Sequence, residues 1–107
     1  MVKLEYSQIV RRKLKDLKSD LCGKYGEKRS KEIITAITKG VRNLEAFPLG
    51  ASVSSIYDVK CDYYYIFVEH NYFFYLIEGE KIIVLEMFNE KEDFMRQLFG
   101  IITTSQQ

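Results

Sequence analysis

Residues Tyr63–Ile77 have the sequence YYYIFV-EHN-YFFYLI, in which two aromatic-rich apolar runs flank three polar residues. Aromatic and β-branched side chains suit a pleated, half-buried surface, so each run is predicted to be a strand. The polar residues Glu69–Asn71 have the length of a hairpin turn. A third apolar run, Lys81–Phe88, follows a second turn-like segment in which Gly79 can adopt a positive φ. The sequence therefore predicts a three-stranded antiparallel meander.

A sheet this apolar needs a cover on at least one face, and the preceding half of the chain is predicted to supply it. A short strand with alternating apolar residues, Val2–Tyr6, comes first, and Ser7 is then a typical helix N-cap. Apolar residues follow at helical spacing along one stripe, and Gly23 is the predicted C-terminal cap of this first helix. The stripe consists of Val10, Leu14, Leu17 and Leu21.

A second helix is predicted over approximately Glu27–Ala46, with an apolar stripe of its own. Gly40 lies inside this helix at a cost of about 1 kcal/mol relative to alanine, so we expect another element to pack closely there. Pro48 ends the helix, because the residue before a proline avoids the α conformation. Leu49–Ser55 is then predicted to be an exposed loop. The short connection between the helices predicts an antiparallel helical hairpin.

The end of the chain has the spacing of a capping box, since Asn89 can cap a helix and Glu92 lies three residues on. A short C-terminal helix is therefore predicted. The fold class is α+β, in the order β-α-α-β-β-β: a helical hairpin packed on a curved, mainly antiparallel sheet, plus this C-terminal helix. Residues 1–102 are expected to form a single domain and residues 103–107 a flexible tail.

The composition is that of a folded protein, with 47% hydrophobic and 29% charged residues and a net charge of +1 over 107 residues. This charge creates no global attraction to nucleic acid or membrane, and no apolar run has the length of a membrane span. The N-terminus lacks the apolar core of a secretory signal, so we expect a cytoplasmic protein whose Cys22 and Cys61 are free thiols. A single histidine argues against a zinc site. We expect no metal, cofactor or small-molecule ligand.

The order of these elements, with these residues, resembles the toxins of the RelE/ParE superfamily of bacterial type II toxin–antitoxin modules. The resemblance extends over roughly residues 2–100, and its last segment is similar to the ending of a ParE-like branch. It is carried by Leu4–Ser7, Phe47–Gly50, Asn71–Lys81 and Val84–Arg96. The resemblance implies one of two activities. RelE-like toxins cleave mRNA on the ribosome, whereas ParE-like toxins inhibit DNA gyrase, and a cognate antitoxin neutralises both.

RNA cleavage of the RelE kind needs cationic side chains that converge on one face of the sheet. The resemblance implies family arginines at the positions of Tyr72 and Glu86 and a family histidine at the position of Asn89. None of these three is a cation here, and Glu86 would repel a phosphate. A toxin that does not hydrolyse RNA is therefore favoured, and whether the chain is an enzyme stays open. The weak catalytic candidates are Tyr72, Lys91 and Arg96.

Two surfaces are candidate binding sites, although single residues of this kind more often pack a sheet or decorate an exposed helix. Tyr and Arg are favoured in macromolecular contacts, which suggests a target-binding surface. Its candidates are Tyr72, Tyr75, Asn89, Lys91 and Arg96. A basic cluster on the first helix is a solvated face or, in the functional interpretation, binds the antitoxin's acidic segment or a nucleic-acid backbone. The cluster consists of Arg11, Arg12, Lys15 and Lys18, together with Lys13.

Three functions follow from these observations. The favoured one is a toxin that inhibits growth by binding a macromolecular target, possibly DNA gyrase, and that a cognate antitoxin neutralises. The first alternative is a RelE-like, ribosome-dependent mRNA endoribonuclease with an altered residue set. The second alternative is a non-toxic co-repressor that binds the antitoxin. No membrane partner is expected.

Overall fold

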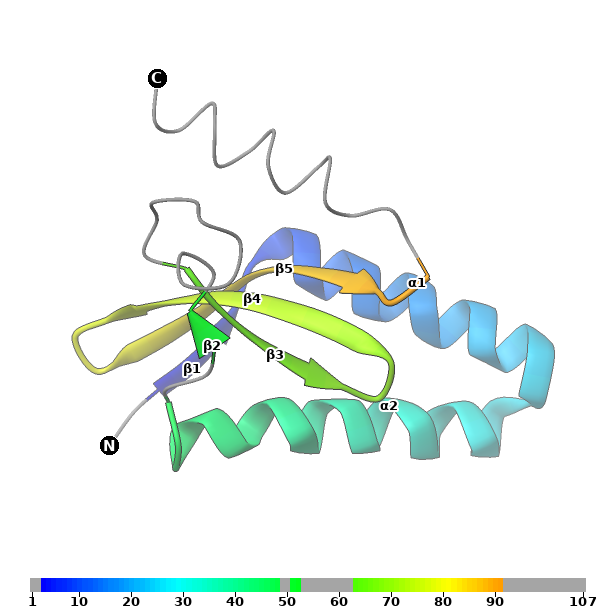
Figure 1. The fold of residues 1–107 in the computed structure, drawn as a ribbon. Helices are drawn as coiled ribbons and strands as arrows, with labels where there is room; N and C mark the ends of the chain where they lie inside the picture. Colours follow the sequence, from blue (N-terminus) through cyan, green and yellow to red (C-terminus); the bar gives the residue numbers. More distant parts are fainter. Residues whose placement is uncertain (1–2, 49–50, 53–62, 92–107) are drawn as a thin grey trace, which may run out of the picture.

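The computed structural model describes residues 3–48, 51–52 and 63–91, and within these ranges two helices cover one face of a five-stranded sheet (Figure 1). The elements are β1 (Lys3–Tyr6), α1 (Gln8–Tyr25), α2 (Glu27–Arg42), the 3₁₀ helix η1 (Asn43–Glu45), β2 (Ala51–Ser52), β3 (Tyr64–Val68), β4 (Asn71–Glu78) and β5 (Lys81–Asn89). The predicted α+β order is confirmed, with β2 as an additional short strand inside the predicted loop. The predicted C-terminal helix and the tail lie outside the described residues.

The strands are arranged in the order β1-β5-β4-β3-β2. The predicted meander is confirmed, because β3, β4 and β5 are antiparallel neighbours. The first strand joins the sheet beside the last one, where β1 pairs in parallel with β5 from Lys3↔Lys81 to Tyr6↔Val84. The β3–β4 turn places Glu69 and His70 at φ values of 46° and 66°, and Gly79 in the next turn has a φ of 59°. Two successive left-handed residues suit the twist of a two-residue hairpin.

Helix α1 begins as predicted, because the Ser7 hydroxyl accepts a hydrogen bond from the Val10 amide at 3.1 Å. Its predicted end at Gly23 is wrong. The helix continues to Tyr25, and the chain turns at Gly26, which has a φ of 86°. A positive φ is the conformation that favours glycine, so Gly26 and not Gly23 separates the helices. Helix α2 is shorter than predicted. It ends at Arg42, and the residues that follow, Asn43–Glu45, form the 3₁₀ helix η1.

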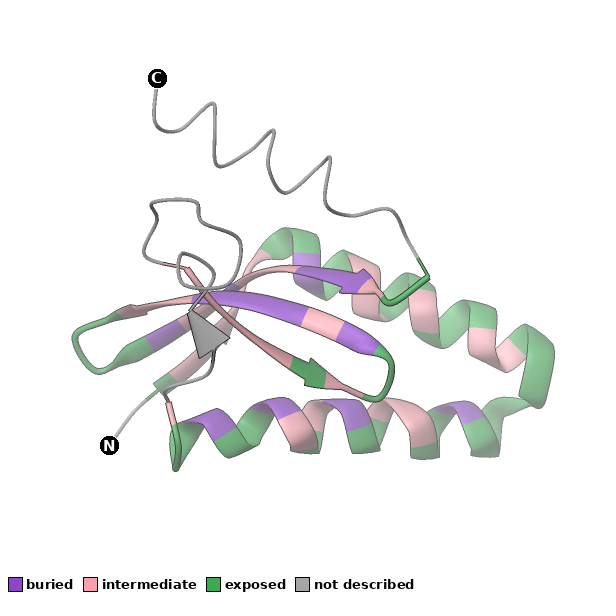
Figure 2. Cartoon of the chain, viewed as in Figure 1, coloured by how far each residue is buried: buried purple, intermediate pink, exposed green. Residues whose placement is uncertain are grey.

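The core lies between the helices and the sheet (Figure 2). Its buried members are Val10, Ile37, Val41, Leu44, Phe73, Tyr75, Ile82, Val84 and Met87. The predicted close approach at Gly40 is confirmed, since a Cβ atom there would overlap the Val68 side chain of β3. Tyr75 is 0% exposed, and its hydroxyl donates a hydrogen bond to the Pro48 carbonyl at 2.7 Å. These contacts fix α2 and the chain that follows it against the meander.

Strand β5 extends beyond its pairing with β1, which ends at Val84. Side chains of α1 and of its N-cap donate hydrogen bonds to the carbonyl groups of β5 that β1 leaves unpaired. The Ser7 hydroxyl donates to the Leu85 carbonyl at 2.9 Å, and the Lys13 ammonium donates to the Met87 carbonyl at 3.0 Å. Buried carbonyl groups need such partners. Leu85 is also the extra residue of a bulge, because neighbouring residues of β4 pair with Glu86 and Val84. The edge of β5 is therefore closed by helix side chains where the parallel strand ends.

Candidate functional site

Lys13 connects α1 to the end of β5 through three contacts. Its ammonium lies 2.6 Å from a Glu86 carboxylate oxygen and 4.2 Å from the centroid of the Phe88 ring, in addition to its bond to the Met87 carbonyl. Glu86, whose side chain is 15% exposed, also accepts a hydrogen bond from the Met87 amide. Glu86 occupies the position where the family resemblance implies an arginine, and its carboxylate neutralises the nearby ammonium of Lys13.

Sequence reasoning counted Lys13 among the solvated cations of α1 and missed this role. The signal was available in the helical spacing, because residue 13 lies three positions after Val10 and four before Leu17, at the border of the apolar stripe. A cation at the border of a buried stripe reaches the neighbouring element more readily than one on the outer surface.

The face of the sheet away from the helices carries a row of aromatic rings. Phe73 belongs to the core, so the alternation of side chains along β4 places Tyr72 and Phe74 on the other face. The Tyr72 ring lies 4.8 Å from that of Phe67 and 5.9 Å from that of Tyr65, which in turn lies 5.8 Å from Phe74. Tyr72 is thus a half-buried member of an aromatic row, in which Phe67 keeps 48% of its surface exposed.

A groove of about 800 Å³ separates the helical hairpin from the β3–β4 turn and the end of β5. Its floor is apolar and consists of Leu17, Leu21, Ile33, Ile37 and Met87. The rim is charged: His70 Nδ1 lies 2.7 Å from a Glu90 carboxylate oxygen, and the Asn89 side chain accepts a hydrogen bond from the Lys91 amide at 2.9 Å. Tyr25, 61% exposed, also lines the groove. An apolar floor with a polar rim is the anatomy of a protein-binding site.

The structure describes four of the five predicted target-binding residues and does not bring these four together. Asn89 and Lys91 both line the groove, whereas Tyr72 lies on the aromatic face. Tyr75 is 0% exposed and packs in the core, so the structure presents none of its ring at the surface. Arg96 lies outside the described residues.

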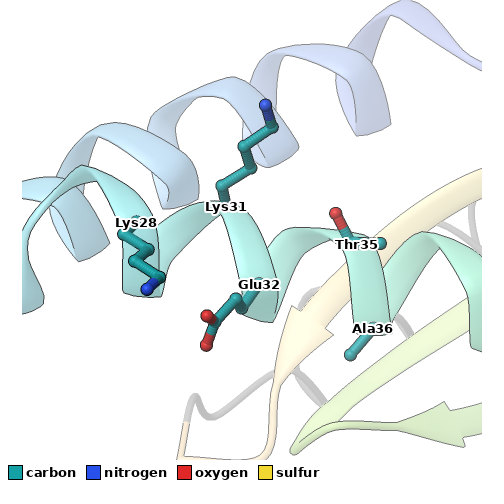
Figure 3. A pocket seen from close by; sticks show the side chains of 5 residues that line it. All are labelled: Lys28, Lys31, Glu32, Thr35 and Ala36. Atoms are coloured by element: carbon teal, nitrogen blue, oxygen red, sulfur yellow. The ribbon is translucent and has the colours of Figure 1, made fainter.

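Apart from Lys13, the basic cluster predicted on α1 is separate from the groove. Arg11, Arg12, Lys15 and Lys18 are all exposed, and none of them lines the groove. A second, shallow depression of about 430 Å³ lies on the outer surface of α2 (Figure 3). It is lined by Lys28, Lys31, Glu32, Thr35 and Ala36, all from that single helix. An open helix surface of this kind does not enclose a small molecule.

The described residues contain no candidate metal site and no candidate membrane-spanning helix. No group of three or more His, Cys, Asp or Glu side chains in these ranges could hold a metal ion. Cys22 is a free thiol whose sulfur lies 2.8 Å from the Ser30 hydroxyl, and Cys61 lies outside the described residues. Within the described ranges, neither helix combines the length and the apolar character that crossing a membrane requires.

Comparisons with known proteins agree with this architecture. A family model described as "ParE toxin of type II toxin-antitoxin system, parDE" matches residues 4–94. A solved structure described as "Chromosomal ParDE TA system from P. aeruginosa" aligns with a TM-score of 0.69 and 15% identity over 83% of this chain and 96% of that chain. At this identity the structural likeness shows a shared fold alone, and no curated protein matches by sequence. The predicted resemblance is confirmed by the family match: this chain belongs to the ParE toxin family of type II toxin–antitoxin systems.

Proposed function

We propose that this toxin inhibits growth by binding DNA gyrase, that it does not cleave RNA, and that a cognate antitoxin neutralises it. The observation that carries the proposal is the ion pair between Lys13 and Glu86. A nuclease needs unopposed positive charge to stabilise the phosphate as negative charge develops on it. Glu86 cancels the charge of Lys13 at the end of β5, so this position offers no net positive charge to hold a phosphate.

The charges around the groove support the same conclusion. Among the described residues, the groove is lined by four Lys or Arg side chains and by four Asp or Glu side chains. Two of the cations are paired, Lys13 with Glu86 and Arg29 with Glu32 at 3.2 Å. The rim is therefore close to neutral, which suits a protein partner that presents mixed charges better than it suits RNA.

Induction of the protein in a bacterium tests the target. We expect growth arrest, loss of negative supercoiling in a reporter plasmid, and intact transcripts. Purified toxin should also inhibit supercoiling of relaxed plasmid by purified gyrase. Arrest with normal supercoiling would exclude gyrase, and new transcript ends in the arrested cells would exclude a non-hydrolytic mechanism. Unimpaired growth would favour the co-repressor function.

A matched pair of variants connects the activity to the groove. Lys91 lines the groove, whereas Lys81 lies at the other end of β5, 3.9 Å from Glu5. We expect Lys91→Glu to weaken gyrase inhibition at least tenfold, because a reversed charge at the rim of an interface disfavours association. Lys81→Glu should retain inhibition. Equal loss in both variants would mean that net charge, and not the groove, determines the activity.

The ribonuclease alternative has one observation in its favour. His70 lies on the groove directly before Asn71, and its Nδ1 atom is 2.7 Å from a Glu90 carboxylate oxygen. Imidazole and carboxylate side chains are the usual general acids and bases of enzymes. If the protein cleaved mRNA through this pair, His70→Ala would abolish cleavage by purified ribosomes without unfolding the chain. We expect no cleavage by the unmodified protein. A ribosome-dependent cut that His70→Ala removes would replace the gyrase proposal.

The antitoxin is proposed to cover the same groove, because its apolar floor suits an amphipathic segment. Tyr25 is an exposed aromatic side chain at the rim, and such residues often anchor protein interfaces. We expect Tyr25→Ala to weaken antitoxin binding by at least tenfold in calorimetry. Phe47→Ala is the matched control, because Phe47 is 78% exposed and does not line the groove. An antitoxin that binds both variants equally well would place its contact elsewhere.

A further inference from the structure

Charge is distributed unevenly between the two halves of this chain. Residues 1–48, which include both helices, contain twelve Lys and Arg against six Asp and Glu, a net charge of +6. Residues 49–107 contain four Lys and Arg against nine Asp and Glu, a net charge of −5. The overall charge of +1 therefore conceals a strongly basic helical half.

The positive charge lies in two rows on the exposed sides of α1 and α2. Arg11, Lys15 and Lys18 follow one another at spacings of four and three residues, which places them on one side of α1. The row on α2 consists of Lys28, Lys31, Lys39 and Arg42, with Thr35 at the intervening helical position. At 1.5 Å per residue the rows are roughly 10 Å and 20 Å long. Together with Arg12 they form what we call the basic face, and all eight cations are exposed.

The cations of the basic face lack acidic partners among the described residues. The salt bridges that the two helices form there are Lys13 with Glu86 and Arg29 with Glu32, and neither includes a residue of the basic face. Glu32 lines the same depression as Lys28 and Lys31, but residues 1–48 still carry a net charge of +6, and the repulsion among these charges costs stability. A polyanion bound on this face would relieve the repulsion and would release its own counterions.

The side chains of the basic face favour nucleic acid over a protein partner. Protein interfaces depend on buried aromatic or aliphatic anchors and are depleted in lysine, whereas this face offers five lysines and three arginines and no apolar anchor within its rows. Single-stranded nucleic acid is bound through aromatic side chains on which bases stack. The aromatic row of this protein lies on the sheet instead. Phosphate contacts without stacking are typical of a duplex.

We infer that the basic face binds the phosphate backbone of duplex DNA without sequence preference. The two antiparallel helices are packed against each other, and packed helices have axes about 8–10 Å apart. This axial separation is similar to the width of a DNA groove, roughly 6–12 Å, so the cations of the two helices can contact phosphates on either side of one groove. The surface would hold the toxin on DNA while the groove between the helices and the sheet stays accessible.

Fluorescence anisotropy with a labelled DNA duplex of arbitrary sequence tests the inference. With about five phosphates contacted, the logarithm of the association constant should fall with the logarithm of salt concentration with a slope of about −4.5. Lys31→Gln combined with Lys39→Gln should reduce that slope by about 2. The matched control is Lys3→Gln combined with Lys81→Gln, which removes two exposed lysines beside Glu5 and should leave the slope unchanged.

Three outcomes would overturn the inference. If circular dichroism shows all variants to be folded and the protein shows no salt-dependent binding to the DNA duplex, the basic face is not a DNA-binding surface. Equal loss of DNA binding in the two double variants would show that binding depends on the net charge of the protein and not on the basic face. Tighter binding of polyglutamate or of duplex RNA than of a DNA duplex with the same charge would assign the basic face to a different partner. Gyrase inhibition can succeed or fail independently of each result.

Discussion

The contact between Gly40 and Val68 allows a sharp test of how α2 is fixed on the sheet. Replacing glycine by alanine in a helix interior gains about 1 kcal/mol of stability when nothing else changes. At residue 40 the added Cβ would overlap Val68 Cγ1 and lie 3.4 Å from Cγ2. A β-branched side chain is stiff, so it cannot simply rotate away. Overpacking of this kind costs about 1–3 kcal/mol, and we expect Gly40→Ala to destabilise the protein by about 1 kcal/mol.

Gly23 supplies the matched control, because it lies inside α1 and an added Cβ would meet no atom within 4 Å. Gly23→Ala should therefore stabilise the protein by about 1 kcal/mol. Urea denaturation followed by circular dichroism measures both variants under the same conditions. The expected difference between them is about 2 kcal/mol. If Gly40→Ala stabilised the protein as much as Gly23→Ala does, the close approach of α2 to β3 would be refuted.

A double variant locates the cause of the cost. Val68→Ala alone removes two methyl groups that pack against the core, so it should destabilise the protein by about 1–3 kcal/mol. In the variant that carries both Gly40→Ala and Val68→Ala, the overlap is relieved. The two effects should therefore combine to less than their sum, by about 1 kcal/mol or more. Strict additivity would show that the two side chains do not meet.

Three further predictions concern the supports of the fold. Ser7→Ala removes both the N-cap of α1 and the bond to the Leu85 carbonyl, and should lower the free energy of unfolding by about 1–2 kcal/mol in urea denaturation, whereas Ser7→Asp should retain the cap. Tyr75→Phe leaves the Pro48 carbonyl without its donor and should cost about 1 kcal/mol by the same assay; no change would exclude that bond. Burial raises the pKa of the Tyr6 hydroxyl above 10.0. The unfolded chain then loses this proton first, so stability should fall above about pH 10, and less so in Tyr6→Phe; identical pH profiles would contradict this.

Local features of the fold were predictable from the sequence because they depend on neighbouring residues. The stripe that begins at Val10, the cap at Ser7 and the turn at Gly79 each follow from spacing or from backbone preference. The end of α1 was misplaced because Gly23 and Gly26 are equally plausible caps in sequence, and only the chain's path shows which one needs a positive φ. The sheet order was beyond prediction, because β1 pairs with β5 across most of the chain.

The candidate site was predicted less well, for a physical reason. Alternation along a strand separates two faces but does not say which face is covered, so the buried Tyr75 and the half-buried Tyr72 look equivalent in sequence. The bulge at Leu85 further shifts the register of β5 against β4. Lys13 was counted as a surface charge because its partners, Glu86 and the Met87 carbonyl, are contributed by a distant strand. Among the predicted target-binding residues that the structure describes, Asn89 and Lys91 lie together on the groove.

The parallel pairing of the first strand with the fifth determines when the molecule can assemble during synthesis. Ser7 and Leu85, joined by a hydrogen bond, are 78 positions apart, and a ribosome adds roughly 5–20 residues per second. The N-terminal strand therefore waits several seconds for the segment that completes its ladder. A message truncated before codon 81 would yield a peptide without β5, the strand that joins β1 to β4, and the five-stranded sheet could not form in such a fragment.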